Sequence, residues 1–136
     1  YIPMHIYPSG LTESIAGLDI PALTPDARML AGALAGVTIE ETDALVMAYI
    51  FDCDKNGIEG AVISTDLASG DLAYLVPSSP YLDSEATWTS ESGAGIVLNG
   101  VANNGTAVVT AKYGDRTWNV PVDVIPGEIA LAIFLP

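Results

Sequence analysis

Hydrophobic and polar residues alternate through most of the chain after residue 43, as they do in strands that bury one face. In residues 116–124, for example, Trp118 and three valines occupy every second position. Short runs of this kind, bounded by turn residues, predict strands at 44–52, 58–65, 72–76, 85–90, 94–99, 106–113, 116–124 and 129–135. The predicted fold class is therefore mainly β, a seven- to eight-stranded antiparallel β-sandwich.

Two local signals refine this pattern near the C-terminus. Gly114 and Asp115 form a two-residue link between neighbouring strands, which predicts a type II′ hairpin because glycine accepts a positive φ at the first position. Pro121 has no N–H group to donate to a ladder. The strand that contains Pro121 is therefore predicted to have an open side.

One short helix is predicted before the strands, over residues 25–35. Thr24 can cap its N-terminus, Pro25 is favoured in the first turn, and Gly36 ends it. The spacing of Gly32 and Gly36 indicates close packing and a C-cap. Apolar residues recur at the spacing of a single buried face, at Ala27, Leu30, Ala31 and Leu34.

The chain divides into two parts on this interpretation. Residues 1–43 hold an irregular N-terminal arm and the helix, and residues 44–136 form the sandwich. Proline or glycine interrupts residues 1–21 every few positions, so this segment is predicted to be a wrapped arm or a loop that has room for a short strand at 2–7.

Both ends of the chain are predicted to be interaction elements. Residues 129–135 are apolar on both faces, whereas an edge strand in water would carry polar or charged residues. Their second face must be covered by the helix and the arm, or by a neighbouring subunit. The predicted interaction residues are Tyr1, Ile2, Met4, Ile6, Tyr7, Ile129, Leu131, Ile133 and Leu135.

The charge balance narrows the classes of partner. The 136 residues include 4 Lys and Arg against 17 Asp and Glu, which gives a net charge of −13. So few cations cannot form the basic patch that nucleic acid or an anionic membrane surface requires. No apolar run approaches the roughly 18 residues of a membrane-spanning helix. We therefore expect protein partners, through self-assembly or other surface proteins, with carbohydrate as an additional option and with no nucleic acid and no membrane insertion.

Residues 52–57 match the beginning of a calcium loop. Asp52, Asp54 and Asn56 place oxygens at alternate positions, and Gly57 allows the sharp turn. The twelfth position is Ile63 instead of glutamate, and predicted strands rather than helices flank the loop. The two interpretations are a hairpin turn with Asx capping and a weak calcium site, and no other cofactor is predicted.

No enzyme is predicted. His5 is the only histidine and lies in the arm, and the sequence contains no G-x-S-x-G motif. Cys53 lies between two carboxylates that disfavour its thiolate, so a core position or a disulfide to a partner is expected instead of catalysis. Trp88 and Trp118 fall on apolar registers and are predicted in the core. Exposure of either in a row with other rings would instead indicate carbohydrate binding.

Three segments share turn motifs with a known class of β-sandwich. Residues 50–63 look like the pattern D-x-x-G-x-P-[I/V]-x-G-A-x-V, with Ile58 in place of the turn proline, and residues 90–93 and 101–111 resemble its next turn and strand entry. These segments resemble the carboxypeptidase regulatory-like (transthyretin-like) domain of bacterial secreted or surface proteins. The resemblance implies a sandwich and an extracytoplasmic location, and it carries over no catalytic residue. An Ig-like sandwich, based on residues 86–124, is the alternative fold.

These observations lead to one expected function and two alternatives. The expected function is that of a non-catalytic extracytoplasmic module, secreted, periplasmic or at the cell surface, that acts in adhesion, scaffolding or surface structure. The first alternative is a subunit of an extracellular filament or pilus-like fibre assembled by strand exchange. The weaker alternative is a carbohydrate-binding module.

Overall fold

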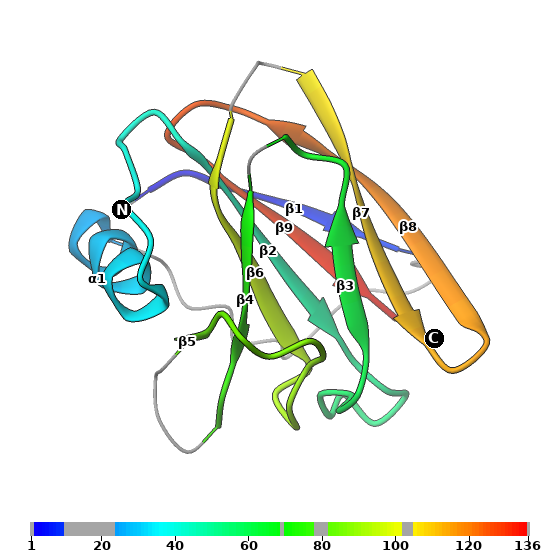
Figure 1. Cartoon of the computed structure of the whole chain (residues 1–136). Coiled ribbons are helices and arrows are strands. Elements are labelled where there is room, and N and C mark those ends of the chain that lie inside the picture. Colours follow the sequence, from blue (N-terminus) through cyan, green and yellow to red (C-terminus); the bar gives the residue numbers. More distant parts are fainter. Residues whose placement is uncertain (1, 10–23, 69, 78–81, 102–104, 136) are drawn as a thin grey trace.

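A computed structural model of the chain describes residues 2–9, 24–68, 70–77, 82–101 and 105–135. In this part of the chain one helix and nine strands are arranged around two open sheets (Figure 1). The elements are β1 (Met4–Pro8), α1 (Pro25–Ala35), β2 (Ala44–Ile50), β3 (Val62–Thr65), β4 (Asp71–Leu75), β5 (Leu82–Asp83), β6 (Ala94–Gly100), β7 (Gly105–Tyr113), β8 (Arg116–Val124) and β9 (Ile129–Phe134).

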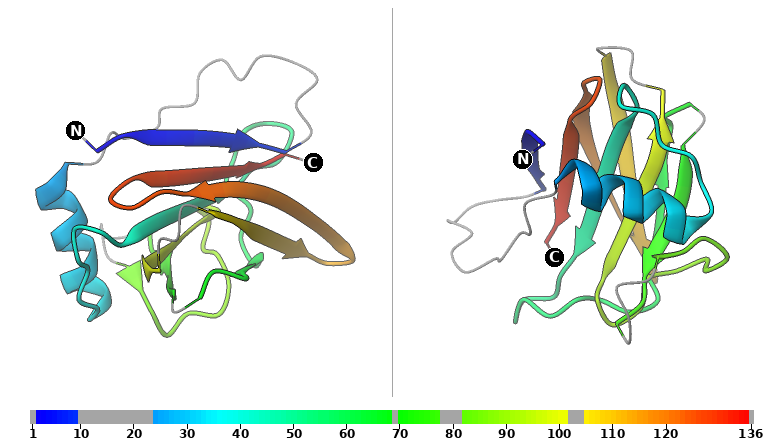
Figure 2. Two further views of the ribbon diagram at one scale, coloured as in Figure 1. Left: turned by 90° about the horizontal axis from the view of Figure 1, so that it is seen from above. Right: turned by 90° about the vertical axis from the view of Figure 1, so that its left-hand side faces the viewer.

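The larger sheet has six strands in the order β1-β9-β2-β6-β4-β5. It is mixed, because β1 and β2 both run parallel to β9 while β2, β6, β4 and β5 pair antiparallel in that order. The C-terminal strand therefore lies inside this sheet, and the N-terminal strand forms its edge (Figure 2).

The smaller sheet has three antiparallel strands in the order β3-β7-β8. Gly114 joins β7 to β8 with a φ of 57°, and Asp115 has no positive φ, which are the signs expected of a type II′ turn. Pro121 lies in the edge strand β8, opposite Val108 of β7. The predicted hairpin and the open side of its second strand are confirmed.

The two sheets pack face to face on a shared apolar core. β8 buries alternate residues, and its inward valines meet side chains of β2, β7 and β9. Val109, Val122 and Phe134 are fully buried members of this core. The alternation in residues 116–124 thus corresponds to one buried face, as predicted.

A second apolar cluster covers the opposite face of the larger sheet, where α1 lies (Figure 2). It includes Leu45, Leu98 and Leu131 of the sheet and Ala35 of the helix. Every residue of β9 is buried as a result. The prediction that the last apolar segment is covered on both faces is confirmed for Ile129–Phe134.

The helix begins and ends where the sequence predicts. Thr24 Oγ1 accepts a hydrogen bond from the N–H of Ala27 at 3.2 Å, and Gly36 adopts a φ of 71° at the C-cap. No helix among the described residues is long and apolar enough to cross a membrane.

The buried face of α1 differs from the predicted one. Arg28, Gly32 and Ala35 are buried, whereas Leu30 is 57% exposed. A Cβ atom on Gly32 would lie only 2.7 Å from the carbonyl oxygen of Val37, so the helix packs closely on the following segment at this position. This close approach turns the glycine face of the helix inward.

Three further predictions are corrected, whereas the short strand considered for the arm is present as β1. The parallel pairings of β9 replace the purely antiparallel arrangement. Residues 85–90 form no strand, because Asp83 Oδ1 accepts the N–H groups of Glu85 and Ala86 in a turn. Trp88 is 58% exposed instead of lying in the core.

Candidate functional site

The loop over residues 51–58 links β2 to β3 and contains the predicted calcium ligands. Asp52 Oδ1 accepts the backbone N–H groups of Asp54 (2.9 Å) and Asn56 (2.8 Å), and Asn56 Nδ2 donates to Asp52 Oδ2 (3.3 Å). These hydrogen bonds favour the carboxylate and so lower the pKa of Asp52, and the bond from the Asn56 backbone has the largest effect. The hydrogen bonds are those of a hairpin turn with Asx capping.

The structure therefore brings Asp52 and Asn56 together and uses their side chains within the loop. The described residues include no cluster of three or more His, Cys, Asp or Glu side chains that could hold a metal ion. Calcium binding at Asp52, Asp54 and Asn56 stays a prediction.

A pocket of about 440 Å³ lies between this loop and the end of the β7–β8 hairpin. The loop and the hairpin end lie at the same end of the molecule, at the lower right of Figure 1. The lining residues are Asp52, Cys53 and Ile58 of the loop and Tyr113, Gly114, Asp115, Arg116 and Trp118 of the hairpin. Two segments far apart in sequence thus form one site, which we call the end pocket.

The register of the hairpin determines which side chains reach the end pocket. Ala111 lies opposite Trp118 and Tyr113 lies opposite Arg116, so all four side chains share the core-facing side of the smaller sheet. Ala111 is fully buried, Trp118 is partly buried against the core, and Tyr113 is 46% exposed. The inner face of the hairpin therefore continues from the core into the pocket.

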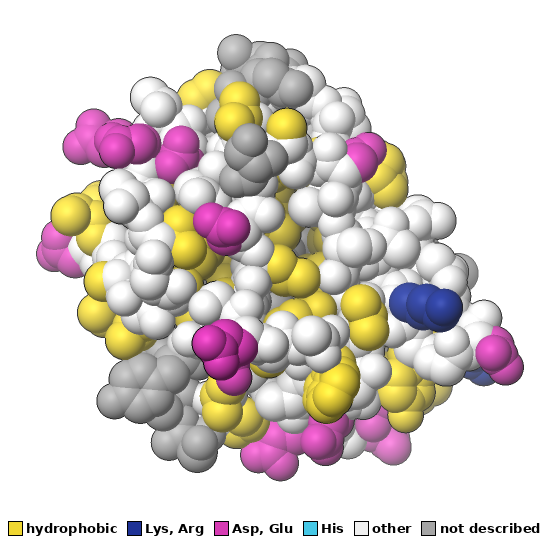
Figure 3. Space-filling model, in the orientation of Figure 1, with side chains coloured by type: hydrophobic (Ala, Val, Ile, Leu, Met, Phe, Trp, Pro, Cys, Tyr) yellow, Lys and Arg dark blue, Asp and Glu magenta, His cyan; other side chains and the backbone are white. Residues whose placement is uncertain are grey.

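Basic residues gather at this end of an otherwise acidic protein. Lys112 and Arg116 belong to the hairpin and Lys55 to the facing loop, whereas Arg28, the fourth cation of the sequence, is buried. On the face drawn in Figure 3, basic side chains appear only at the hairpin end, and carboxylates are spread around the rest. Because acidic residues such as Asp115 also lie here, the local charges nearly balance.

Cys53 is a free, exposed thiol in the wall of the end pocket. The predicted core position for Cys53 is therefore wrong. A disulfide to a partner stays a prediction.

The predicted interaction residues of the two chain ends lie side by side in the larger sheet. β1 pairs with β9 from Met4 opposite Ile129 to Pro8 opposite Ile133. Ile129, Leu131 and Ile133 are buried and Leu135 is partly buried. In the arm, Ile2, Met4 and Tyr7 pack partly buried on the two cores and Ile6 is 51% exposed, while Tyr1 lies outside the described residues.

Besides this apolar packing, β1 makes two exposed polar side-chain contacts with the rest of the chain. His5 Nε2 lies 2.6 Å from Glu128 Oε2, and the Tyr7 hydroxyl donates to Asp123 Oδ2 of β8 at 3.0 Å. Burial, with the hydrogen bond to Asp123, raises the pKa of Tyr7. Among the described residues, β1 is an edge strand of the larger sheet and has β9 as its only neighbour there.

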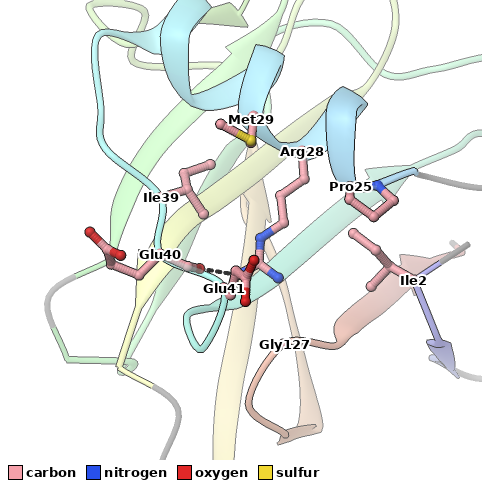
Figure 4. A pocket seen from close by; sticks show the side chains of 8 residues that line it. All are labelled: Ile2, Pro25, Arg28, Met29, Ile39, Glu40, Glu41 and Gly127. Carbon is pink, nitrogen blue, oxygen red and sulfur yellow. Dashed lines mark hydrogen bonds between the residues drawn. The ribbon is translucent and has the colours of Figure 1, made fainter.

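A second pocket, of about 400 Å³, lies beside the first turn of α1 (Figure 4). Arg28 Nη2 donates to the backbone oxygens of Glu40 (2.6 Å) and Asp43 (2.5 Å), which ties the helix to the segment before β2. Burial lowers the pKa of Arg28, although Asp43 and Glu41 act in the opposite direction. The guanidinium of Arg28 therefore serves the fold at this pocket.

Comparison with known proteins assigns no family. No protein-family model matches the chain, and no curated protein matches it. The resemblance to carboxypeptidase regulatory-like domains thus stays a prediction from turn motifs.

Asp115 and Arg116, which line the end pocket, are not among the residues predicted from the sequence. A signal was present, because Tyr113 and Arg116 flank a two-residue turn and must face each other across the hairpin. Which loop lies opposite the hairpin, however, is decided by the packing of the two sheets, and no local sequence pattern specifies that packing.

Proposed function

We propose that this chain is a non-catalytic module of an extracytoplasmic protein that acts through its surface in adhesion, scaffolding or surface structure. The resemblance to transthyretin-like domains supports the location, and the two packed sheets are consistent with such a sandwich. The observation that carries the proposal is the end pocket. It is built from a loop and a hairpin end on a packed scaffold, which is where β domains commonly place binding residues.

A pair of charge variants tests this proposal. Arg116→Gln removes a cation that lines the end pocket, whereas Lys112→Gln removes a cation from the outer face of the same hairpin. Both substitutions change the net charge equally, and both side chains are exposed. The immobilised chain is exposed to a panel of purified surface proteins and polysaccharides. The proposal expects a ligand that Lys112→Gln retains and Arg116→Gln loses; equal retention by the two variants, or no retention by the wild type, contradicts it.

A second candidate function is that of a filament subunit assembled by strand exchange. The specific observation is that, in the part of the chain that the structure describes, β1 lies at the sheet edge and pairs with β9 alone. The same strand from a neighbouring subunit could therefore make identical backbone bonds with β9. Both faces of β9 are apolar and buried, so β9 is held firmly and offers a strand from a neighbour a fixed edge to pair with.

Deletion of residues 1–10 separates this candidate from the first one. Light scattering measures the mass of the intact and shortened chains, and far-UV circular dichroism checks that both are folded. A change from polymer to monomer supports strand exchange. A monomer before and after deletion, with lowered stability, assigns β1 a purely structural role.

A further inference from the structure

We propose that the end pocket binds one neutral hexopyranose unit of a saccharide. This inference rests on the proposed function, since it names the ligand class for the same site. It depends on three properties of the described residues: aromatic surface, available hydrogen-bonding groups and balanced charge.

The inner wall of the end pocket is apolar. Tyr113 and Trp118 present aromatic rings from neighbouring strands, and Ile58 lies on the loop side, partly buried against the core. A pyranose ring carries a face of C–H groups that packs on aromatic rings, as other compact apolar surfaces do. The volume of about 440 Å³ lies in the usual range of small-molecule sites, roughly 300–1,000 Å³.

The rim of the end pocket is polar and has unused hydrogen-bonding capacity. Among the described residues, neither Asp115 nor Arg116 has a side-chain hydrogen bond or ion pair in the structure. Asp52 uses both carboxylate oxygens within its loop, but three hydrogen bonds leave about one of its roughly four acceptor positions open. Sugar hydroxyls both donate and accept, so they suit a rim that offers carboxylate acceptors and guanidinium donors together.

The charge around the end pocket favours a neutral ligand. Arg116 lies in the lining with Asp52 and Asp115, so the lining offers no net cationic site for a carboxylate or phosphate. The net charge of −13 adds long-range repulsion of any anion. A neutral sugar avoids both costs, and its hydroxyls suit the carboxylates and the guanidinium of the rim.

Two reporters in the chain make binding measurable without a label on the ligand. Trp88 and Trp118 are the only tryptophans, so Trp88→Phe leaves the emission of Trp118 as the signal from the end pocket. Cys53 is the only cysteine and lines the same pocket, so its alkylation by iodoacetamide should slow when the pocket is occupied. The probes are maltohexaose, cellohexaose and mannohexaose, with hexagalacturonate as the anionic comparison.

We expect at least one neutral hexasaccharide to change the emission of Trp118 with saturation and to slow alkylation of Cys53, with a Kd of about 1 mM or below. Tyr113→Ala and Arg116→Gln should weaken that binding about tenfold or more, a difference of about 1.4 kcal/mol. Lys112→Gln, on the outer face of the hairpin, should bind like the parent.

The inference is overturned if no neutral hexasaccharide alters either reporter, if hexagalacturonate alone binds, or if Tyr113→Ala and Arg116→Gln bind like the parent. Its failure is distinguishable from failure of the proposed function. If a purified surface protein is retained through Arg116 while no sugar binds, the proposed function stands and the ligand class is wrong. If nothing is retained through Arg116, both are wrong.

Discussion

Tyr74→Phe should destabilise the fold markedly, because the Tyr74 hydroxyl links the two sheets. Tyr74 lies in β4 of the larger sheet and is 2% exposed. Its hydroxyl accepts the N–H of Ile63 in β3 at 3.0 Å and donates to the carbonyl of the same residue at 3.3 Å. Phenylalanine fills nearly the same volume, so the loss of these two bonds is the main perturbation.

The expected magnitude follows from the groups left behind. A buried backbone group without a partner costs about 1–3 kcal/mol. In Tyr74→Phe, the N–H and the carbonyl of buried Ile63, in the edge strand β3, would both lose the partner that the hydroxyl provides. We expect a loss of about 2–4 kcal/mol in the free energy of unfolding, the sum of one strong and one weaker penalty.

Urea unfolding followed by circular dichroism measures this loss, with an unchanged m value indicating that the compactness of both states is preserved. Tyr49→Phe is the matched control. Tyr49 is partly buried, stacks on Phe51 at a centroid distance of 5.7 Å, and has no hydroxyl hydrogen bond among the described residues. Tyr49→Phe should lower the free energy of unfolding by less than about 0.5 kcal/mol. Equal stability of the two variants would refute the reasoning.

Three further predictions concern pH and backbone geometry. Burial raises the pKa of Tyr74 and Tyr49 above the ordinary 10.0, so the folded state keeps protons that the unfolded state releases. Stability should therefore fall as pH rises beyond 10.0, and less steeply in Tyr74→Phe; an identical alkaline slope in urea titrations would contradict this. Because the pKa of Asp52 is lowered from 3.8, its support of the loop should be present above that pH and lost as pH falls through the lowered value. The protection of the Asp54 and Asn56 amides against hydrogen exchange, relative to the intrinsic rate at each pH, should then fall in acid in the wild type and already be low at neutral pH in Asp52→Ala; unchanged protection in the variant would disprove the Asx turn. Finally, Gly93→Ala should lower the melting temperature far more than Gly114→Ala. Both glycines have a positive φ, which costs about 1–3 kcal/mol for alanine, but only at Gly93 would a Cβ collide with backbone, 2.3 Å from the oxygen of Ile50. Similar losses in the two variants would contradict the steric argument.

Short-range chemistry was sufficient to predict several elements from the sequence alone. Thr24 and Gly36 place both ends of α1, because a capping side chain and a residue tolerant of positive φ act within one turn of the backbone. Gly114 and Pro121 likewise predict the hairpin and the open edge of β8. Alternation in residues 116–124 predicts the buried face of β8, since successive side chains of a strand must point to opposite sides.

Partners across the sheets were decided by tertiary structure. Residues 85–90 alternate like a strand, yet Asp83 takes the N–H groups of Glu85 and Ala86, and Trp88 is left exposed. The apolar pattern of residues 129–135 indicates that both faces of this segment are buried. It does not indicate that β1 and β2 pair with it on either side in the parallel direction. Such pairings join opposite ends of the chain, so their free energy depends on contacts that no local window contains.

The end pocket combines residues that the sequence marks with neighbours that only the tertiary structure supplies. The sequence marked Asp52, Asp54 and Asn56 as a loop with candidate ligands and placed Tyr113 beside a turn. Only the packing of one sheet on the other brings that loop to the inner face of the hairpin, where Arg116 and Trp118 become its neighbours. Turn chemistry is set by the φ angles and hydrogen bonds of a few consecutive residues, whereas a site between two sheets exists only after the core has fixed their distance and register.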